Sequence, residues 1–365
     1  MPEFIKGMEL CEGFFKEEAE PIINKCFPEL KYSAGLIGYG SDVLGYDDTV
    51  STDHMWGPRF YMFIGDEDLP LKNEILNALS DCLPYTYKGY SVNFSKPDPN
   101  DNGVRHPEFI TSERVDPLIW IQTFDSYLKE QLGTSDLESI KPIGWLKLSE
   151  HRLLSLISGR FFKDDLNLTD KLKPIRYYPH EVKLYLAASL WSFTASEQAF
   201  VKRAADCGDD TGSRIITSRI AEHLMRLCFL YSDTYTPYSK WFGTAFSKLK
   251  IDESIKNHII KAVSADDADE REKSLVLAQF EIAKTHNLSG LTDSVDVKIE
   301  DYYGRDIKVI FAEKIVEAIQ AKLLYTPFEN MPLVGSFSQH IGFADVADDV
   351  ENNRGADLWD RFLLK

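Results

Sequence analysis

The first third of the chain alternates between two kinds of apolar pattern. Apolar residues over positions 3–26 recur near the 3.6-residue period of an amphipathic helix, whereas the apolar run 34–40 is as short as a strand and ends in glycine. The full set of expected elements is a helix at 3–26, strands at 34–40 and 59–64, a helix at 70–83, and strands at 85–94 and 118–122. Strands that alternate with helices favour an α/β domain with a small mixed sheet.

The pattern changes after residue 126, where long helical periodicities replace the strands. They cover residues 126–132, 145–158, 180–206, 213–231, 252–262, 267–286 and 311–324, and the stretch 331–365 is less regular. We therefore predict two domains, an α/β (α+β) domain over residues 1–126 that includes the N-terminal helix, and an all-α helical domain over residues 127–365.

Composition narrows the class of protein. The 365 residues are 44% hydrophobic, yet no run approaches the ~20 apolar residues of a membrane span, and the N-terminus has no signal-peptide core. Five scattered cysteines without a CxxC pair fit a reducing cytoplasm. The net charge of −17 and the lack of a basic run argue against nucleic acid as a partner. Such an acidic chain is better suited to binding a metal ion, a nucleotide and a small or cationic substrate than to binding nucleic acid.

The strongest local signal runs from Gly38 to Arg59. Gly40-Ser41 follows the first predicted strand, and Asp53 follows after eleven intervening residues, before the next strand. A glycine lets backbone approach a phosphate, and the serine adds a hydroxyl and an N–H group. Carboxylates two positions apart on a strand share a face and can hold the same hard cation.

This order of residues resembles the nucleotidyltransferase superfamily, in which Gly-Ser is followed by Asp-x-Asp or Asp-x-Glu, and in particular the antibiotic nucleotidyltransferases. The chain is also similar to the bacterial DUF4037 family, whose N-terminal segment looks like GSEVLG followed by STDHDWGPR. The matching segments here are 40–45 and 51–59, together with 158–160, 203–214, 225–229, 237–246 and 286–287.

The resemblance implies transfer of a nucleoside monophosphate from a nucleoside triphosphate such as ATP to a hydroxyl of a small-molecule or protein acceptor. It places the β- and γ-phosphates at Gly40 and Ser41 and a Mg²⁺ ion at Asp53, the catalytic and metal-binding residue. Arg59, Arg214 and Lys240 are the expected cations that contact phosphate.

The chain departs from the pattern at Met55, where the resemblance leads us to expect an aspartate. A thioether is a soft, neutral ligand that suits Mg²⁺ poorly. At ~4 Å and an effective dielectric of ~20, the lost charge pair is worth about 4 kcal/mol. The superfamily's third carboxylate also has no clear match, because Asp116 and Asp125 only flank the strand at 118–122. The alternative is therefore a catalytically impaired nucleotide- or ligand-binding protein on the same scaffold.

Several of these residues have a simpler structural interpretation. Gly40, Ser41 and Asp53 also fit a tight turn with an aspartate cap, and Arg59 also fits a salt bridge. Asp47-Asp48 is interpreted as a solvated turn rather than a ligand pair.

Two segments of the helical region also leave both interpretations open. The acidic stretch 206–214 suits a helix N-terminus as well as an active-site cap. The stretch 238–244, which contains Lys240, fits either a site that stacks a base or an aromatic turn packed between helices.

Overall fold

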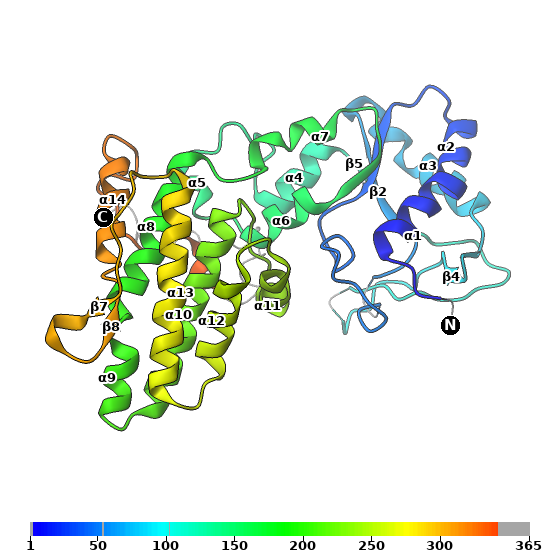
Figure 1. The fold of residues 1–365 in the computed structure, drawn as a ribbon. Coiled ribbons are helices and arrows are strands. Elements are labelled where there is room, and N and C mark those ends of the chain that lie inside the picture. The colour runs from blue at the N-terminus through cyan, green and yellow to red at the C-terminus, as the bar shows by residue number, and fades with distance from the viewer. Residues whose placement is uncertain (1–2, 53–54, 102, 342–365) are drawn as a thin grey trace. The chain divides into compact units, whose positions relative to one another are not determined.

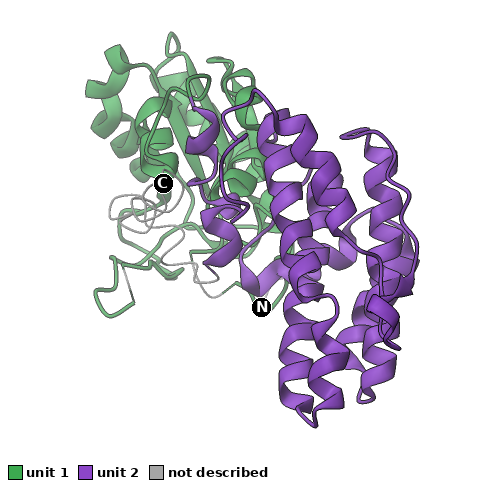
Figure 2. Ribbon diagram, turned by 90° about the vertical axis from the view of Figure 1, so that its left-hand side faces the viewer, with its two compact units in different colours: residues 1–139, 152–176 green, residues 140–151, 177–365 purple. Residues whose placement is uncertain are grey.

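The computed structural model describes residues 3–52, 55–101 and 103–341, which form parts of two compact units. Unit 1 comprises residues 1–139 and 152–176, and unit 2 comprises residues 140–151 and 177–365 (Figure 2). The chain thus leaves unit 1 and returns to it once, beyond the boundary that we expected at residue 126. The returning segment stays with unit 1 because it supplies a strand of the sheet.

Unit 1 is built on a four-stranded mixed sheet with the strand order β5-β2-β1-β6. Its strands are β1 (Tyr32–Leu36), β2 (Arg59–Ile64), β5 (Leu118–Gln122) and β6 (Arg160–Asp164). β2 pairs in parallel with β5, and β1 pairs antiparallel with both β2 and β6. The predicted small mixed sheet is confirmed. β6 was not predicted from the sequence, because its side chains are at most partly buried and do not alternate between buried and exposed positions.

The N-terminal helical segment keeps one direction but changes its hydrogen-bonding pattern along its length. α1 (Gly7–Phe14) passes into a π-helical turn (Phe15–Ala19) and then into α2 (Glu20–Cys26). The wide turn ends just before Pro21, which lacks the N–H group of a regular helix. Phe14 and Phe15 are both fully buried and both pack on Phe60 of β2, with ring centroids 6.1 and 5.2 Å away. The helix therefore covers one face of the sheet, as Figure 1 shows.

Residues 72–82 and 124–132 are helical, as the sequence patterns predict, and the helix expected over 145–158 begins only at Glu150. Residues 85–94 differ from the prediction. There the expected strand is a hairpin of two short strands, whose Lys88-Gly89 turn has positive φ at both residues (+48° and +85°). The elements are a 3₁₀ helix (Asp66–Leu71), α3 (Lys72–Cys82), β3 (Thr86–Tyr87), β4 (Tyr90–Ser91), α4 (Phe124–Leu132), α6 (Glu150–Ser158, which begins in unit 2), α7 (Leu168–Lys171) and a 3₁₀ turn (Lys173–Ile175).

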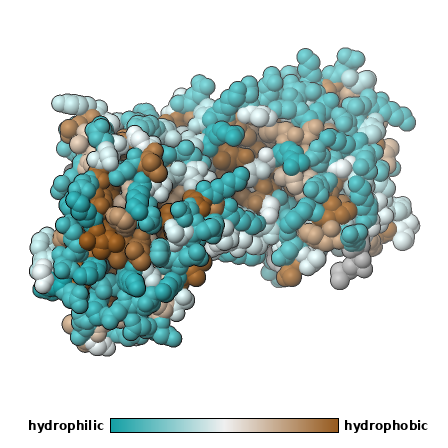
Figure 3. Space-filling view, viewed as in Figure 1, coloured by the Kyte–Doolittle hydropathy of each residue, from teal (hydrophilic) through white to brown (hydrophobic). Residues whose placement is uncertain are grey.

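Unit 2 is a helical domain in which long helices run side by side (Figure 1), as the periodicity predicts, but the helix expected over 180–206 is divided in two between residues 197 and 200. Its helices are α5 (Pro142–Trp145), α8 (His180–Glu197), α9 (Phe200–Asp206), α10 (Asp210–Tyr231), α11 (Ser239–Lys248), α12 (Glu253–Ser264), α13 (Ala268–Ser289), α14 (Glu313–Leu323) and α15 (Phe337–His340), with a short hairpin of β7 (Glu300–Asp301) and β8 (Lys308–Val309). Hydrophilic residues cover much of the face seen in Figure 3. Among the described residues, none of the helices has the length and apolarity needed to cross a membrane.

A chain of hydrogen bonds crosses the helices of unit 2 from the buried Trp191 to the exposed Asp293. The Nε1–H group of Trp191 donates to the Tyr231 hydroxyl (2.7 Å), and that hydroxyl lies 3.0 Å from Nδ1 of His286. On the far side of the ring, Nε2 lies 2.9 Å from the Thr292 hydroxyl, which donates to the carbonyl of Asp293 (2.8 Å). Because Thr292 has its proton committed, Nε2 is the donor and Nδ1 the acceptor. The chain requires a neutral imidazole, and burial lowers the pKa of His286 to about 4.

Candidate functional site

The residues of the predicted nucleotide site lie in the connection between β1 and β2. The backbone of this connection has positive φ at Gly38 (+81°) and Gly40 (+129°), and the carbonyl of Ser41 accepts the N–H group of Tyr46 (2.8 Å). A Cβ atom at Gly40 would lie 2.2 Å from Oδ1 of Asp42 and 2.6 Å from Nη2 of Arg59. Position 40 is therefore restricted to glycine by both its backbone angle and its neighbours. The side chain of the next residue, Ser41, is half-buried.

Asp42 and Arg59 form a buried ion pair directly behind this turn. Nη2 of Arg59 lies 2.8 and 2.9 Å from the two carboxylate oxygens of Asp42, and the two side chains are 2% and 1% exposed. Burial raises the pKa of Asp42, and the charge of Arg59 opposes that rise. The guanidinium also donates to the carbonyl of Tyr39 (3.4 Å). Arg59 thus has the salt-bridge role, and it fastens both ends of the connection to each other.

Asp47 and Asp48 have different surroundings. The Asp47 carboxylate is buried, accepts the Gly7 N–H group at the start of α1 (2.7 Å) and the Trp56 indole N–H group (3.4 Å), and pairs with Lys6 (3.3 Å). Asp48 is exposed and accepts the N–H groups of the turn residues 50 and 51, both at 2.9 Å, which lower its pKa. The solvated-turn interpretation is right for Asp48 and wrong for Asp47.

The carboxylates of this connection do not offer a ready magnesium site. Asp42, Asp47 and Asp48 are each held by donors of the protein itself, and the described residues contain no cluster of three His, Cys, Asp or Glu side chains that could hold a metal. The predicted ligand Asp53 and its neighbour His54 lie outside the described residues. Met55 has a left-handed backbone (φ +48°), which asparagine and aspartate adopt more readily than methionine does.

The carboxylates that flank β5 are also engaged. Asp116 pairs with Lys96 (2.6 Å) and Arg105 (2.9 Å); burial raises the pKa of Asp116, but these two cations outweigh it and lower the pKa overall. Asp125 lies in the first turn of α4 and faces Lys171 at 3.9 Å. Neither has the surroundings expected of a third metal ligand.

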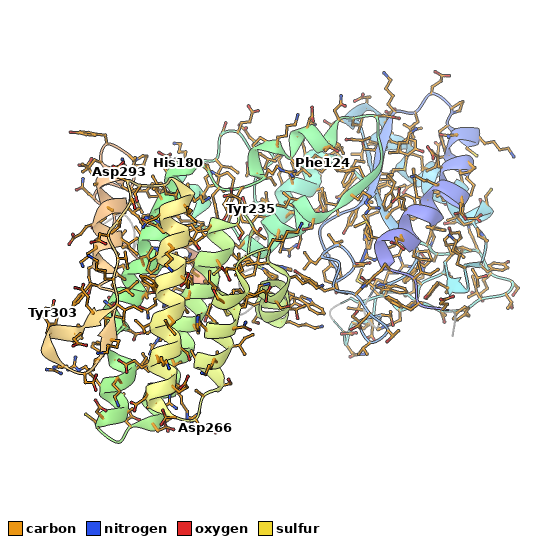
Figure 4. The ribbon with its side chains drawn as sticks, in the orientation of Figure 1. Phe124, His180, Tyr235, Asp266, Asp293 and Tyr303 are labelled. Atoms are coloured by element: carbon orange, nitrogen blue, oxygen red, sulfur yellow. The ribbon has the colours of Figure 1, made fainter. Side chains whose placement is uncertain are left out.

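Arg214 and Lys240 belong to unit 2. Arg214, on α10, pairs with Asp210 (2.7 Å) and with Asp266 (3.2 Å), which lies at the turn between α12 and α13 (Figure 4). The acidic stretch before α10 acts as a helix start, because the Asp209 carboxylate caps the N–H group of Gly212 (2.7 Å). Lys240 is exposed on α11, and its Nζ lies 5.1 Å from the ring centroid of Trp241. One of the two interpretations of this segment from the sequence was an aromatic turn, whereas the structure has a helix here.

Asp42 is the buried charged residue of this connection that the sequence interpretation missed. It follows Ser41 directly within the segment 40–45, and the signal available was its combination with an arginine that opens the next strand. An aspartate and an arginine at the two ends of a connection can form an ion pair that links those ends. The motif alone does not show which of its charged side chains are buried.

The comparisons with known proteins support the DUF4037 resemblance. The model of the family described as "Domain of unknown function (DUF4037)" matches residues 145–242. No curated protein sequence matches the chain. A solved structure of a nucleotidyltransferase-like protein from Exiguobacterium sibiricum 255-15 is similar, with 10% identity, 80% of this chain and 97% of that chain covered, and a TM-score of 0.31. That TM-score is too low to carry an argument, so the fold class stands on the sheet and helices described above.

Proposed function

We propose that the protein binds a nucleoside triphosphate at the β1–β2 connection and transfers its nucleoside monophosphate to a hydroxyl of a small-molecule or protein acceptor. The observation that carries the proposal is the partly buried turn at Gly40-Ser41, which a buried Asp42–Arg59 pair supports from behind. A glycine turn followed by a serine can offer backbone N–H groups and a hydroxyl to a phosphate. The residue order that resembles the nucleotidyltransferases runs through this same turn.

The proposed role of each residue takes account of the contacts that its side chain already makes within the protein. Gly40 and Ser41 contact the β- and γ-phosphates, while Arg59 shapes the turn through its ion pair with Asp42. Asp53 is the proposed ligand of Mg²⁺, an ion that would neutralise triphosphate charge. Arg214 and Lys240 stay candidate phosphate contacts from unit 2.

The alternative is a protein that binds the nucleotide without transferring it. The observation that favours it is the commitment of Asp42, Asp47 and Asp48 to other partners, together with the neutral Met55 where a second carboxylate is expected. Such a protein keeps the phosphate turn and loses the chemistry.

A thermal-shift panel of the four nucleoside triphosphates, with and without Mg²⁺, tests the site. A ligand at 100 times its Kd stabilises by about 2.7 kcal/mol, which raises the Tm of a unit of this size by about 5–10 °C. We expect one nucleotide to give a Mg²⁺-dependent rise that Asp53→Ala abolishes. Asp66→Ala is the matched control, because Asp66 is an exposed aspartate of the same unit. No shift with any nucleotide contradicts both functions.

Pyrophosphate release separates transfer from binding. The wild type and Met55→Asp are compared with the nucleotide that shifts the Tm and a mixture of hydroxyl acceptors. Release by the wild type supports transfer. Release by Met55→Asp alone supports the binding protein.

A further inference from the structure

The proposed function needs cations near the phosphates, and the Arg59 guanidinium is already paired with Asp42. Unit 1 contains a separate cavity of about 480 Å³ whose wall carries three cationic side chains, Arg160, Lys173 and Arg176. They come from the start of β6 and from the 3₁₀ turn and the residue that follows it. This volume lies within the range of small-molecule sites.

The wall of this cavity adjoins the start of the β1–β2 connection. Arg160 stands opposite Leu36, the last residue of β1, in the antiparallel ladder. A Cβ atom at the lining residue Gly159 would lie 2.7 Å from the Cα atom of Ile37. The next residue of the connection, Gly38, donates its N–H group to the carbonyl of Ser155 (3.1 Å). A lining residue of the cavity therefore packs against the start of the connection, three positions before Gly40.

The charge of the lining is one-sided. Among the described residues, three cations line the cavity and no carboxylate does, in a chain whose net charge is −17. Lys173 pairs with Asp170 (2.9 Å), and Arg160 pairs with Glu12 (2.6 Å). Both carboxylates lie outside the lining, and Glu12 is shared with Lys16 (2.6 Å).

Arg176 completes this set without a partner. Its guanidinium is exposed and makes no ion pair or hydrogen bond with any residue that the structure describes. Besides Gly159 and Thr169, the other lining residues carry apolar side chains. These are Leu156, Ile157, Phe161 and Leu172.

We propose that this cavity binds polyphosphate, and that Arg160, Lys173 and Arg176 neutralise the phosphates of the nucleoside triphosphate held at Gly40-Ser41. The second part of the proposal rests on the proposed function. Guanidinium and ammonium groups are the side chains that bind phosphate oxygens most strongly, and an unpaired arginine gives up no existing contact when it does so. The three residues bind the phosphates and take no part in making or breaking bonds.

Calorimetric titration with inorganic tripolyphosphate and with the nucleoside triphosphate from the thermal-shift panel tests the cavity. Lys173→Gln combined with Arg176→Gln removes two exposed cations without disturbing the core. We expect the Kd for both ligands to rise at least tenfold. Arg176→Lys should keep most of the affinity, and Lys72→Gln, which removes an exposed cation elsewhere in unit 1, should keep all of it.

The two ligands make failure of the cavity distinguishable from failure of the function. If the nucleotide binds the double variant as tightly as the wild type, the cavity proposal is overturned and the proposed function stands. If tripolyphosphate binds the cavity but no nucleotide binds the wild type, the polyphosphate site is supported and the function is overturned. An equal loss of affinity in Lys72→Gln identifies a nonspecific charge effect and overturns the cavity.

Discussion

The buried Asp42–Arg59 pair gives the sharpest prediction about unit 1. Arg59→Met keeps the length and apolar stem of the side chain but leaves the Asp42 carboxylate buried and unpaired. Removing one partner of a buried pair costs about 3–5 kcal/mol. For a unit of roughly 150–200 residues this lowers the Tm by about 6–20 °C. Lys72→Met, at an exposed helix position, should change stability by less than about 0.5 kcal/mol.

A second substitution separates the loss of the pair from general disruption of the core. Arg59→Met with Asp42→Asn removes both charges, so the remaining cost is that of a buried amide, about 1–3 kcal/mol. The loss of stability of the single variant relative to the wild type should also shrink as the pH falls from 7 towards 4. The sign follows from the buried Asp42, whose folded-state pKa lies above its unfolded value, so its protonation favours the folded state at low pH.

Urea unfolding followed by far-UV circular dichroism and tryptophan fluorescence measures these changes. Trp56 and Trp120 report on unit 1. A loss below about 1 kcal/mol in Arg59→Met would show that the pair does not hold the connection together. A double variant no more stable than the single one, or a single variant whose loss relative to the wild type does not shrink at low pH, would refute the electrostatic explanation.

Three further predictions concern other positions. Gly40→Ala should destabilise unit 1 by more than the ~1–3 kcal/mol of a strained backbone, because its Cβ atom also meets the buried ion pair. The control is Gly45→Ala, which has φ +70° and no atom within 4 Å of a Cβ, so that it carries the backbone cost alone. Equal urea midpoints for the two variants would contradict this prediction. Stability should fall between pH 6.5 and 4 as His286, buried and neutral when folded, takes up a proton on unfolding, a change of at most about 3.4 kcal/mol. In the pH profile of urea unfolding, His286→Gln should remove this share and leave that of His223, whose pKa burial also lowers to about 4. Met55→Asp should retain the wild-type Tm within about 2 °C, since aspartate tolerates a left-handed backbone, and a larger loss by thermal unfolding would place Met55 in a packing role.

The sequence by itself determined the kinds of element and most of their places. β2 and β5 were predicted within a residue of their bounds, because a buried strand must be apolar whatever it packs against. Long helices of unit 2 such as α12 and α14 were predicted because each carries one apolar face, whereas α8 is apolar and buried on nearly all sides. Gly40 was singled out correctly as a special position, because a turn that no side chain can occupy leaves a glycine in the sequence.

Only the tertiary structure decided which charges are paired. Arg59 and Asp42 are 17 positions apart, and Arg160 and Glu12 are 148 positions apart, so no local pattern links them. The same limit explains the missed strand β6, whose partly exposed side chains become a strand only because β1 offers an edge to pair with. Burial of a charge depends on what folds over it, and that information is spread along the whole chain.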